Sequence, residues 1–107
     1  MKLPANIIIE KSKLTEYLLK KRERNDKAGF LDIAGYNLEN WEQLDKDLRN
    51  HVLNNDATIV EQNEYGTFYK INSELKGPMK TLKITAICMY DKQKNQYKFI
   101  TLYPFKE

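Results

Sequence analysis

The sequence predicts an α+β fold, in which three N-terminal helices pack on one face of a four-stranded antiparallel meander. Three observations carry this prediction. Before residue 56 the apolar side chains recur at the spacing of helices, whereas after it they alternate with polar ones at the spacing of strands. The third observation is length, because 107 residues make one domain. We therefore expect a single domain, residues 1–107, with a helical part over 1–56 and a sheet over 57–107.

Composition narrows the class of protein. Hydrophobic residues make up 41% and charged residues 31%, which is typical of a chain that folds. No apolar run approaches the ~20 residues of a membrane span, and the N-terminus lacks the long apolar stretch of a signal peptide. One cysteine and one histidine exclude an internal disulfide, a paired-cysteine metal site and a two-histidine mechanism. We expect no membrane contact and no metal.

An extended segment and a first helix open the chain. Pro4 disfavours an early helix, and Ile7-Ile8-Ile9 favours a strand or packing on the core. Ser12 is a candidate N-cap, and the apolar residues after it lie at helical spacing. These are Leu14, Tyr17 and Leu18. We expect this helix to end near Arg24-Asn25.

Two further helices are expected before residue 56. Asp26 is a candidate cap for a short one, which Gly35 should end as the residue after the C-cap. Asn37 is a candidate cap for the third, and Asn54-Asn55-Asp56 should break it. Its predicted apolar stripe is Leu38, Trp41, Leu44, Leu48 and Val52. Its predicted solvent side is Glu39, Glu42, Asp45, Lys46 and Asp47.

Four strands follow, separated by short polar turns. They are expected at 57–62, 67–71, 82–90 and 96–103. A five-residue loop over 91–95 predicts the register of the last hairpin, in which Met89 pairs with Tyr97, Ile87 with Phe99, Thr85 with Thr101, and Lys83 with Tyr103. The opposite face is aliphatic and should pack on the helices. It holds Leu82, Ile84, Ala86, Cys88, Ile100 and Leu102.

The face of this hairpin that carries the paired residues is a candidate floor for a cleft, because it offers hydroxyls, aromatic rings and a lysine. The alternative is structural, since Thr and Tyr are good strand formers on any half-exposed face. Cys88, in the middle of an aliphatic strand, is expected to be a core residue and not a nucleophile.

Positive charge is clustered in one place only. The net charge is +3, and Lys20, Lys21, Arg22, Arg24 and Lys27 gather within eight positions. Such a cluster suits either the solvated C-terminal end of a helix or contact with phosphate. Lys27 lies at the expected start of a helix, where either a bound anion or plain solvation would explain a cation. His51 is either a boundary residue of the third helix or a general acid or base.

Five short motifs resemble a family of small bacterial domains that occur alone and at the C-termini of polymorphic toxins. They are Asp26-Lys27-Ala28-Gly29-Phe30, Gly35-Tyr36, Asn40-Trp41, Tyr65-Gly66-Thr67 and Phe99-Ile100-Thr101-Leu102-Tyr103-Pro104. The order of helices before a meander is also similar to the BECR ribonuclease fold, named for barnase, EndoU, colicin and RelE.

That resemblance implies a toxin-type ribonuclease that works without metal or cofactor and uses the 2′-hydroxyl as nucleophile, with tRNA as one candidate substrate. It places Lys27 and Thr101 in the matching motifs, and His51 in a weaker match. The expected roles are His51 as base or acid, Lys27 as stabiliser of the phosphorane, and Thr101 as hydrogen-bond donor to the phosphate.

Five further residues are expected to hold the RNA. They are Arg24, Lys83, Tyr65, Thr85 and Tyr103. The resemblance also implies a cognate immunity or antitoxin protein, and action in the cytoplasm after delivery as the C-terminal module of a larger secreted toxin. Two alternatives stay open. One is a non-catalytic interaction module, such as an immunity protein, and the other is a module that stacks RNA bases on Tyr97, Phe99 and Tyr103.

Overall fold

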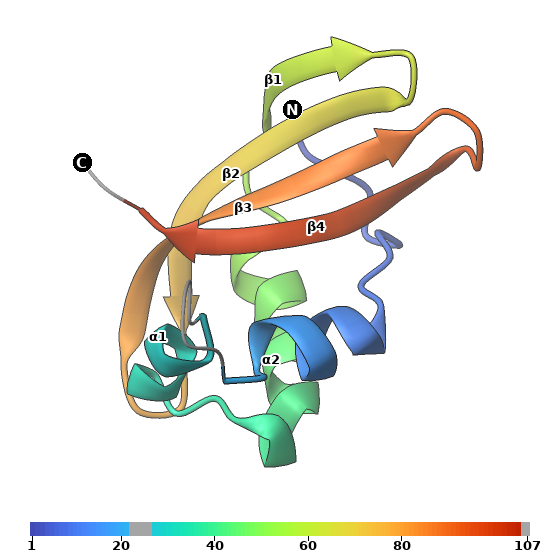
Figure 1. The fold of residues 1–107 in the computed structure, drawn as a ribbon. Helices are drawn as coiled ribbons and strands as arrows, with labels where there is room; N and C mark the ends of the chain where they lie inside the picture. The colour runs from blue at the N-terminus through green and yellow to red at the C-terminus, as the bar shows by residue number, and fades with distance from the viewer. Residues whose placement is uncertain (22–26, 106–107) are drawn as a thin grey trace.

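The computed structural model describes residues 1–21 and 27–105, and it confirms the α+β class and the antiparallel meander. The sheet has the strand order β1-β2-β3-β4, and the helical segments gather below it (Figure 1). The strands are β1 (Thr58–Asn63), β2 (Gly66–Lys76), β3 (Thr81–Asp91) and β4 (Gln96–Pro104). The second strand runs five residues past its expected end, so β2 and β3 form a long hairpin.

The helical part consists of short segments of mixed type and not of three regular helices. They are η1 (Lys13–Leu18), α1 (Lys27–Ile33), η2 (Leu38–Asn40), α2 (Trp41–Asp47) and η3 (Leu48–Val52). Both η1 and η3 are π-helical, and η2 is a 3₁₀ turn that leads directly into α2. The expected end of the first helix near Arg24 is wrong, because η1 ends at Leu18. The expected cap Asp26 lies outside the described residues.

Capping explains where η2 begins and where α1 ends. The Asn37 side chain accepts hydrogen bonds from the backbone N–H groups of Glu39 and Asn40, as its prediction as an N-cap requires. Gly35 has φ +95°, and Gly35 and Tyr36 donate to the carbonyls of Asp32 and Leu31, the pattern of a Schellman ending. Ser12 stands at the N-cap position of η1, as predicted, but its side chain makes no capping hydrogen bond.

One core joins the helical segments to the sheet. Leu44, Leu48 and Val52 are fully buried, as their helical spacing predicted, whereas Leu38 is 51% exposed. Cys88 is also fully buried, and burial raises the pKa of its thiol to about 12, so it is a core residue as expected. Asp47 departs from its predicted place on the solvent side and is buried.

The register of the last hairpin differs from the prediction. Tyr90 pairs with Tyr97, Cys88 with Phe99, Ile87 with Thr101, and Thr85 with Tyr103. The turn holds four residues and not five, and a bulge between Ile87 and Cys88 leaves Ile100 as an extra residue in β4. As a result Phe99, and not Ile100, joins the core cluster.

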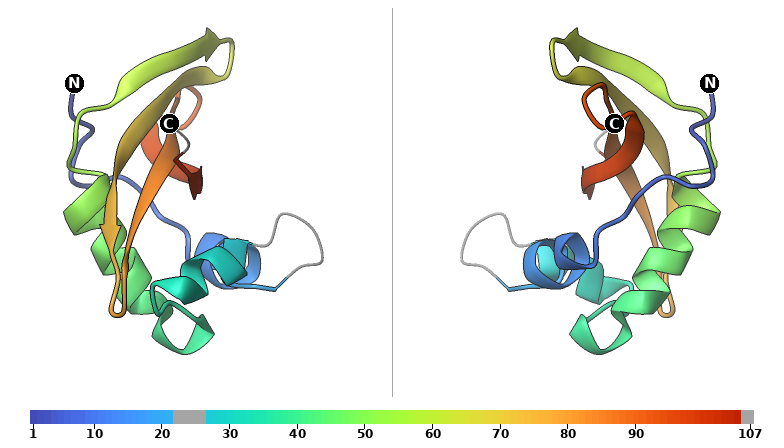
Figure 2. Two further views of the ribbon diagram at one scale, coloured as in Figure 1. Left: turned by 90° about the vertical axis from the view of Figure 1, so that its left-hand side faces the viewer. Right: turned by 90° about the vertical axis from the view of Figure 1, so that its right-hand side faces the viewer.

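The N-terminal segment lies against the sheet, as its extended character predicted. Ile8 forms a parallel bridge to Lys98 of β4, where its N–H donates to the Tyr97 carbonyl and its carbonyl accepts from the Phe99 N–H. The two side views show the strong twist of the sheet, with the helical segments gathered below one end of it (Figure 2). This arrangement brings η1 against the later half of β4.

Candidate functional site

Tyr17 joins the helical part to the last strand through a polar contact. Its phenol oxygen lies 3.1 Å from Oγ1 of Thr101, a hydrogen bond between residues 84 positions apart in the chain. Both side chains are half-buried, so the contact remains open to solvent on one side. The contact therefore forms at the boundary between η1 and β4.

Two lysines surround the same tyrosine. The ammonium of Lys27, the first residue of α1, lies 5.6 Å from the centre of the Tyr17 ring. The ammonium of Lys13, one turn earlier in η1, lies 5.4 Å from the same ring centre. We name Lys13, Tyr17, Lys27 and Thr101 the tyrosine cluster.

These neighbours change the acidity of the Tyr17 phenol. The hydrogen bond from Thr101 lowers its pKa most, and the hydrogen bond and charge of Lys27 and the charge of Lys13 lower it further. Partial burial acts in the opposite direction but does not outweigh them, so the pKa lies below that of an ordinary tyrosine. A tyrosine stabilised in its phenolate form can take a proton from a substrate.

Local irregularities in the chain position these groups. In η1 the Leu19 N–H donates to the Leu14 carbonyl, an i to i+5 bond that widens the helical turn carrying Tyr17. In β4 the bulge at Ile100 precedes Thr101 directly, and bulges commonly redirect the side chains beside them. Both departures from regular structure flank the tyrosine cluster.

The structure brings two of the three expected catalytic residues together and leaves the third elsewhere. Lys27 and Thr101 both contact Tyr17. His51 instead lies in η3, where it lines a hollow with Asn55, Ser73 and Glu74. Its carbonyl accepts from Asn55 and Ser73, and its Nδ1 atom is buried without a hydrogen-bond partner in the described part of the chain.

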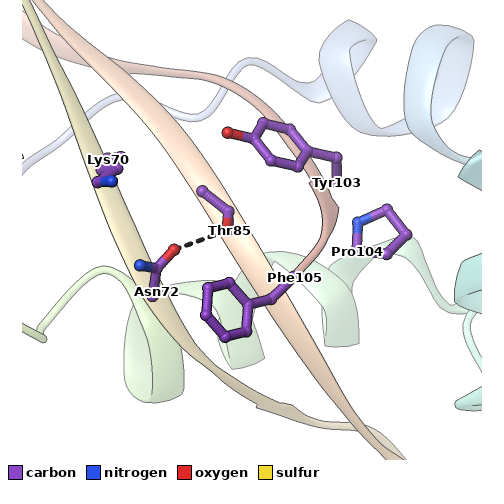
Figure 3. A pocket seen from close by; sticks show the side chains of 6 residues that line it. All are labelled: Lys70, Asn72, Thr85, Tyr103, Pro104 and Phe105. Atoms are coloured by element: carbon purple, nitrogen blue, oxygen red, sulfur yellow. Dashed lines mark hydrogen bonds between the residues drawn. The ribbon is translucent and has the colours of Figure 1, made fainter. Parts of the chain in front are cut away.

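A second hollow, of about 560 Å³, lies on the face of the sheet turned away from η3 (Figure 3). It is lined by Lys70, Asn72, Thr85, Tyr103, Pro104 and Phe105. Thr85 is buried at its floor and donates a 2.6 Å hydrogen bond to the Asn72 side-chain oxygen. Two of the expected RNA-binding residues, Thr85 and Tyr103, therefore share one site.

The other expected RNA-binding residues do not line this hollow. Lys83 is exposed on the same face of β3 as Thr85. Tyr65 lies in the turn between β1 and β2. It is six positions before Ile71, which pairs with Ala86 of β3. Arg24 lies outside the described residues.

The burial of the three aromatic side chains tests part of the base-stacking alternative. Phe99 is only 2% exposed and belongs to the core, so it cannot stack on a base. Tyr97 packs against Tyr69 and Tyr90, with ring centres 6.2 and 4.8 Å away. Of the three expected stacking residues, Tyr103 alone faces the hollow.

Sequence reasoning did not identify Tyr17 and Lys13 as site residues, nor Lys70, Asn72 and Phe105. Tyr17 was assigned to the apolar stripe because it follows Leu14 by three positions. Its hydroxyl gains a role only where η1 meets β4. A helical lysine four positions before a tyrosine, as with Lys13 and Tyr17, is the signal that could have marked the pair.

Within residues 1–21 and 27–105, no three His, Cys, Asp or Glu side chains are placed so that they could hold a metal ion. In the same part of the chain, no helix has the length and apolar character needed to cross a membrane.

Comparison with known proteins gives a family for the whole domain. No curated protein and no solved structure matches the chain. One family model, described as a domain of unknown function (DUF6883), matches residues 2–106. The match covers nearly the entire chain, including the tyrosine cluster and the second hollow. The chain therefore belongs to the DUF6883 family.

Proposed function

We propose that this chain is a metal-independent endoribonuclease domain of toxin type. The observation that carries the proposal is the Tyr17 phenol, whose pKa is lowered by Thr101 and by two lysines. A proton acceptor beside fixed positive charge is what cleavage at a 2′-hydroxyl requires. The resemblance to the BECR ribonucleases supports the same reaction class.

In the proposed reaction, the Tyr17 phenolate takes the proton of the 2′-hydroxyl. The 2′-oxygen then attacks the adjacent phosphorus, and the bond from phosphorus to the 5′-oxygen breaks. The products are a 2′,3′-cyclic phosphate and a 5′-hydroxyl end, which takes its proton from one of the cluster ammonium groups. Atoms and charge balance without a metal or a cofactor.

The lysines have the electrostatic role in this reaction. The phosphorane carries more negative charge than the starting diester, so fixed ammonium groups stabilise it more than the substrate. Lys27 keeps the role expected from the sequence. Thr101 changes role, because its hydroxyl contacts Tyr17 and holds the phenolate in place rather than contacting the phosphate.

A toxin of this kind acts on RNA in the cytoplasm, tRNA included, and is delivered as the C-terminal module of a larger secreted protein. Its producer needs a cognate immunity or antitoxin protein. Because the catalytic lysines are open to solvent on one side, we expect that inhibitor to be acidic and to cover the tyrosine cluster. Co-purification with the product of the adjacent gene tests this expectation.

Induced expression in a bacterium tests the proposed activity. The wild-type chain should arrest growth, and Tyr17→Phe should restore it, because the variant keeps the ring but loses the proton acceptor. Tyr90→Phe is the matched control, since it removes a phenol that bonds Asn95 at the far end of the last hairpin. Normal growth with the wild-type chain would favour the interaction-module alternative instead.

A further inference from the structure

The second hollow carries an inference that rests on the proposed function and concerns its substrate. We propose that this hollow is a subsite for one unpaired nucleotide of single-stranded RNA, next to the scissile phosphate. Its base would lie against Tyr103 and Phe105, and its phosphate would face Lys70. The domain would then select unpaired RNA over a duplex.

Continuity along β4 places the hollow beside the tyrosine cluster. Thr101 pairs with Ile87 and Tyr103 with Thr85, and the bulge lies outside this stretch. Side chains two positions apart on a strand share one face, about 7 Å from one another. A strand of RNA whose scissile phosphate lies at the tyrosine cluster can therefore extend to Tyr103 in one nucleotide step.

The aromatic rings of the hollow are available for stacking. Tyr103 and Phe105 are 41% and 37% exposed, and their rings point from the end of β4 over β3, on either side of Thr85 (Figure 3). A 3.0 Å hydrogen bond from the Phe105 N–H to the Lys83 carbonyl holds Phe105 in place beyond the strand. Stacking on fixed rings accepts any base, whereas a base already paired within a duplex cannot enter between them.

Two polar groups on β2 complete the subsite. Lys70 lines the hollow and supplies the positive charge that a phosphate needs. The Asn72 oxygen already accepts from Thr85, and its amide nitrogen has no partner among residues 1–21 and 27–105. That nitrogen can donate to an acceptor on the edge of the stacked base. The two aromatic rings, the lysine and the asparagine amide therefore all line the same hollow.

Binding of a labelled 2′-O-methyl RNA oligonucleotide to the full chain, measured by fluorescence anisotropy, tests the subsite. Methylation removes the nucleophile, so binding is measured without cleavage. Tyr103→Leu and Lys70→Gln should each weaken binding about tenfold, and the same sequence as a duplex should bind more weakly than the single strand. Lys94→Gln, an exposed lysine in the β3–β4 turn, is the charge control and should bind as the wild type does.

Three outcomes separate this inference from the proposed function. Wild-type affinity in both variants, or equal affinity for duplex and single strand, overturns the subsite even if the protein cleaves RNA. Weakened binding in the variants, with no cleavage of ordinary RNA by the wild type, upholds the subsite and overturns the nuclease. If Tyr103→Leu fails to fold by circular dichroism, Phe105→Leu replaces it, because Phe105 lies beyond the strand and outside the core.

Discussion

Tyr17 shows how an ordinary residue acquires chemistry from its surroundings. Its place in the sequence, three positions after Leu14, predicts packing, and its ring does pack against the core. Its hydroxyl, however, meets a threonine 84 positions away and an ammonium from another helix. Lys27 and Thr101 were candidates from the sequence because short motifs contain them. Tyr17 was not a candidate, because only tertiary packing places its hydroxyl between them.

The pH dependence of cleavage should report the Tyr17 phenol. A lowered pKa favours the phenolate, so kcat/KM should rise with pH and level off below pH ~10, where an ordinary tyrosine titrates. Thr101→Val removes the largest lowering contribution, so the pKa should rise and the profile should move to higher pH. Rates at fixed neutral pH should fall about tenfold for each unit of that shift. An unchanged profile in Thr101→Val would remove Thr101 from the account.

His51 allows a direct comparison between the site expected from the sequence and the site proposed from the structure. Because its side chain lines a hollow with Ser73 and Glu74, and the cluster forms without it, His51→Gln should retain nearly the wild-type rate of cleavage. A loss of 10²-fold or more at unchanged stability, as removal of a general acid or base causes, would restore His51 to the mechanism. Single-turnover cleavage beside a thermal melt measures both quantities.

Among the elements, the turn between α1 and η2 shows where sequence patterns lose information. Gly35 and Asn37 specify the local turns, and both were predicted. Asp47 was expected in solvent, yet it accepts a 2.6 Å hydrogen bond from the Tyr36 hydroxyl and another from Gln43. Burial and the nearby carboxylate raise the pKa of Tyr36, so the phenol stays protonated and donates. Helical spacing assigns a face to Asp47 but cannot show that the preceding turn covers it.

Removing this hydrogen bond should destabilise the fold without touching the tyrosine cluster. In Tyr36→Phe the buried Asp47 loses its shortest donor, at a cost of about 1–3 kcal/mol in the free energy of unfolding. Urea denaturation measures this change, with Tyr90→Phe as the control for loss of an exposed hydroxyl. A difference below ~0.5 kcal/mol between the two variants would show that Gln43 or water satisfies the carboxylate.

The β3–β4 hairpin shows the same limit in a strand. Its existence and its aliphatic face followed from alternation, since most of the expected inward residues are buried. Its register did not, because Asp91 pairs with Gln96 and the bulge adds one residue to β4. Nothing in the alternation marks Ile100 as the extra residue. The bulge matters for the proposed site because it directly precedes Thr101.

At the scale of the whole molecule, the fold class and strand order were predictable, since both follow from local periodicity and short connections. The site was predictable only in part. Lys27 and Thr101 come from separate halves of the chain, and the geometry that joins them depends on how η1 docks on β4. Docking between distant segments cannot be predicted from residue spacing or composition. Helix caps and alternating strands can be, because they depend on residues close together in the sequence.

Independence from metal is a prediction that concerns the whole of the proposed reaction. All groups in the proposed mechanism belong to the chain, so EDTA should leave RNA cleavage intact. Loss of cleavage in EDTA, with recovery on addition of a divalent metal, would contradict this prediction. The measurement compares cleavage rates of the purified chain with and without chelator, and Tyr17→Phe gives the background from contaminating nucleases.

End-group analysis of the cleaved RNA tests the central claim most directly. The purified chain is incubated with RNA in EDTA, and the new 3′ ends are identified by their chemistry. The account predicts 2′,3′-cyclic phosphates from the wild type, none from Tyr17→Phe at equal folded concentration, and no cleavage where the 2′-oxygen is methylated. Equal yields of cyclic phosphate from the wild type and from Tyr17→Phe would contradict it, as would 3′-hydroxyl ends from the wild type.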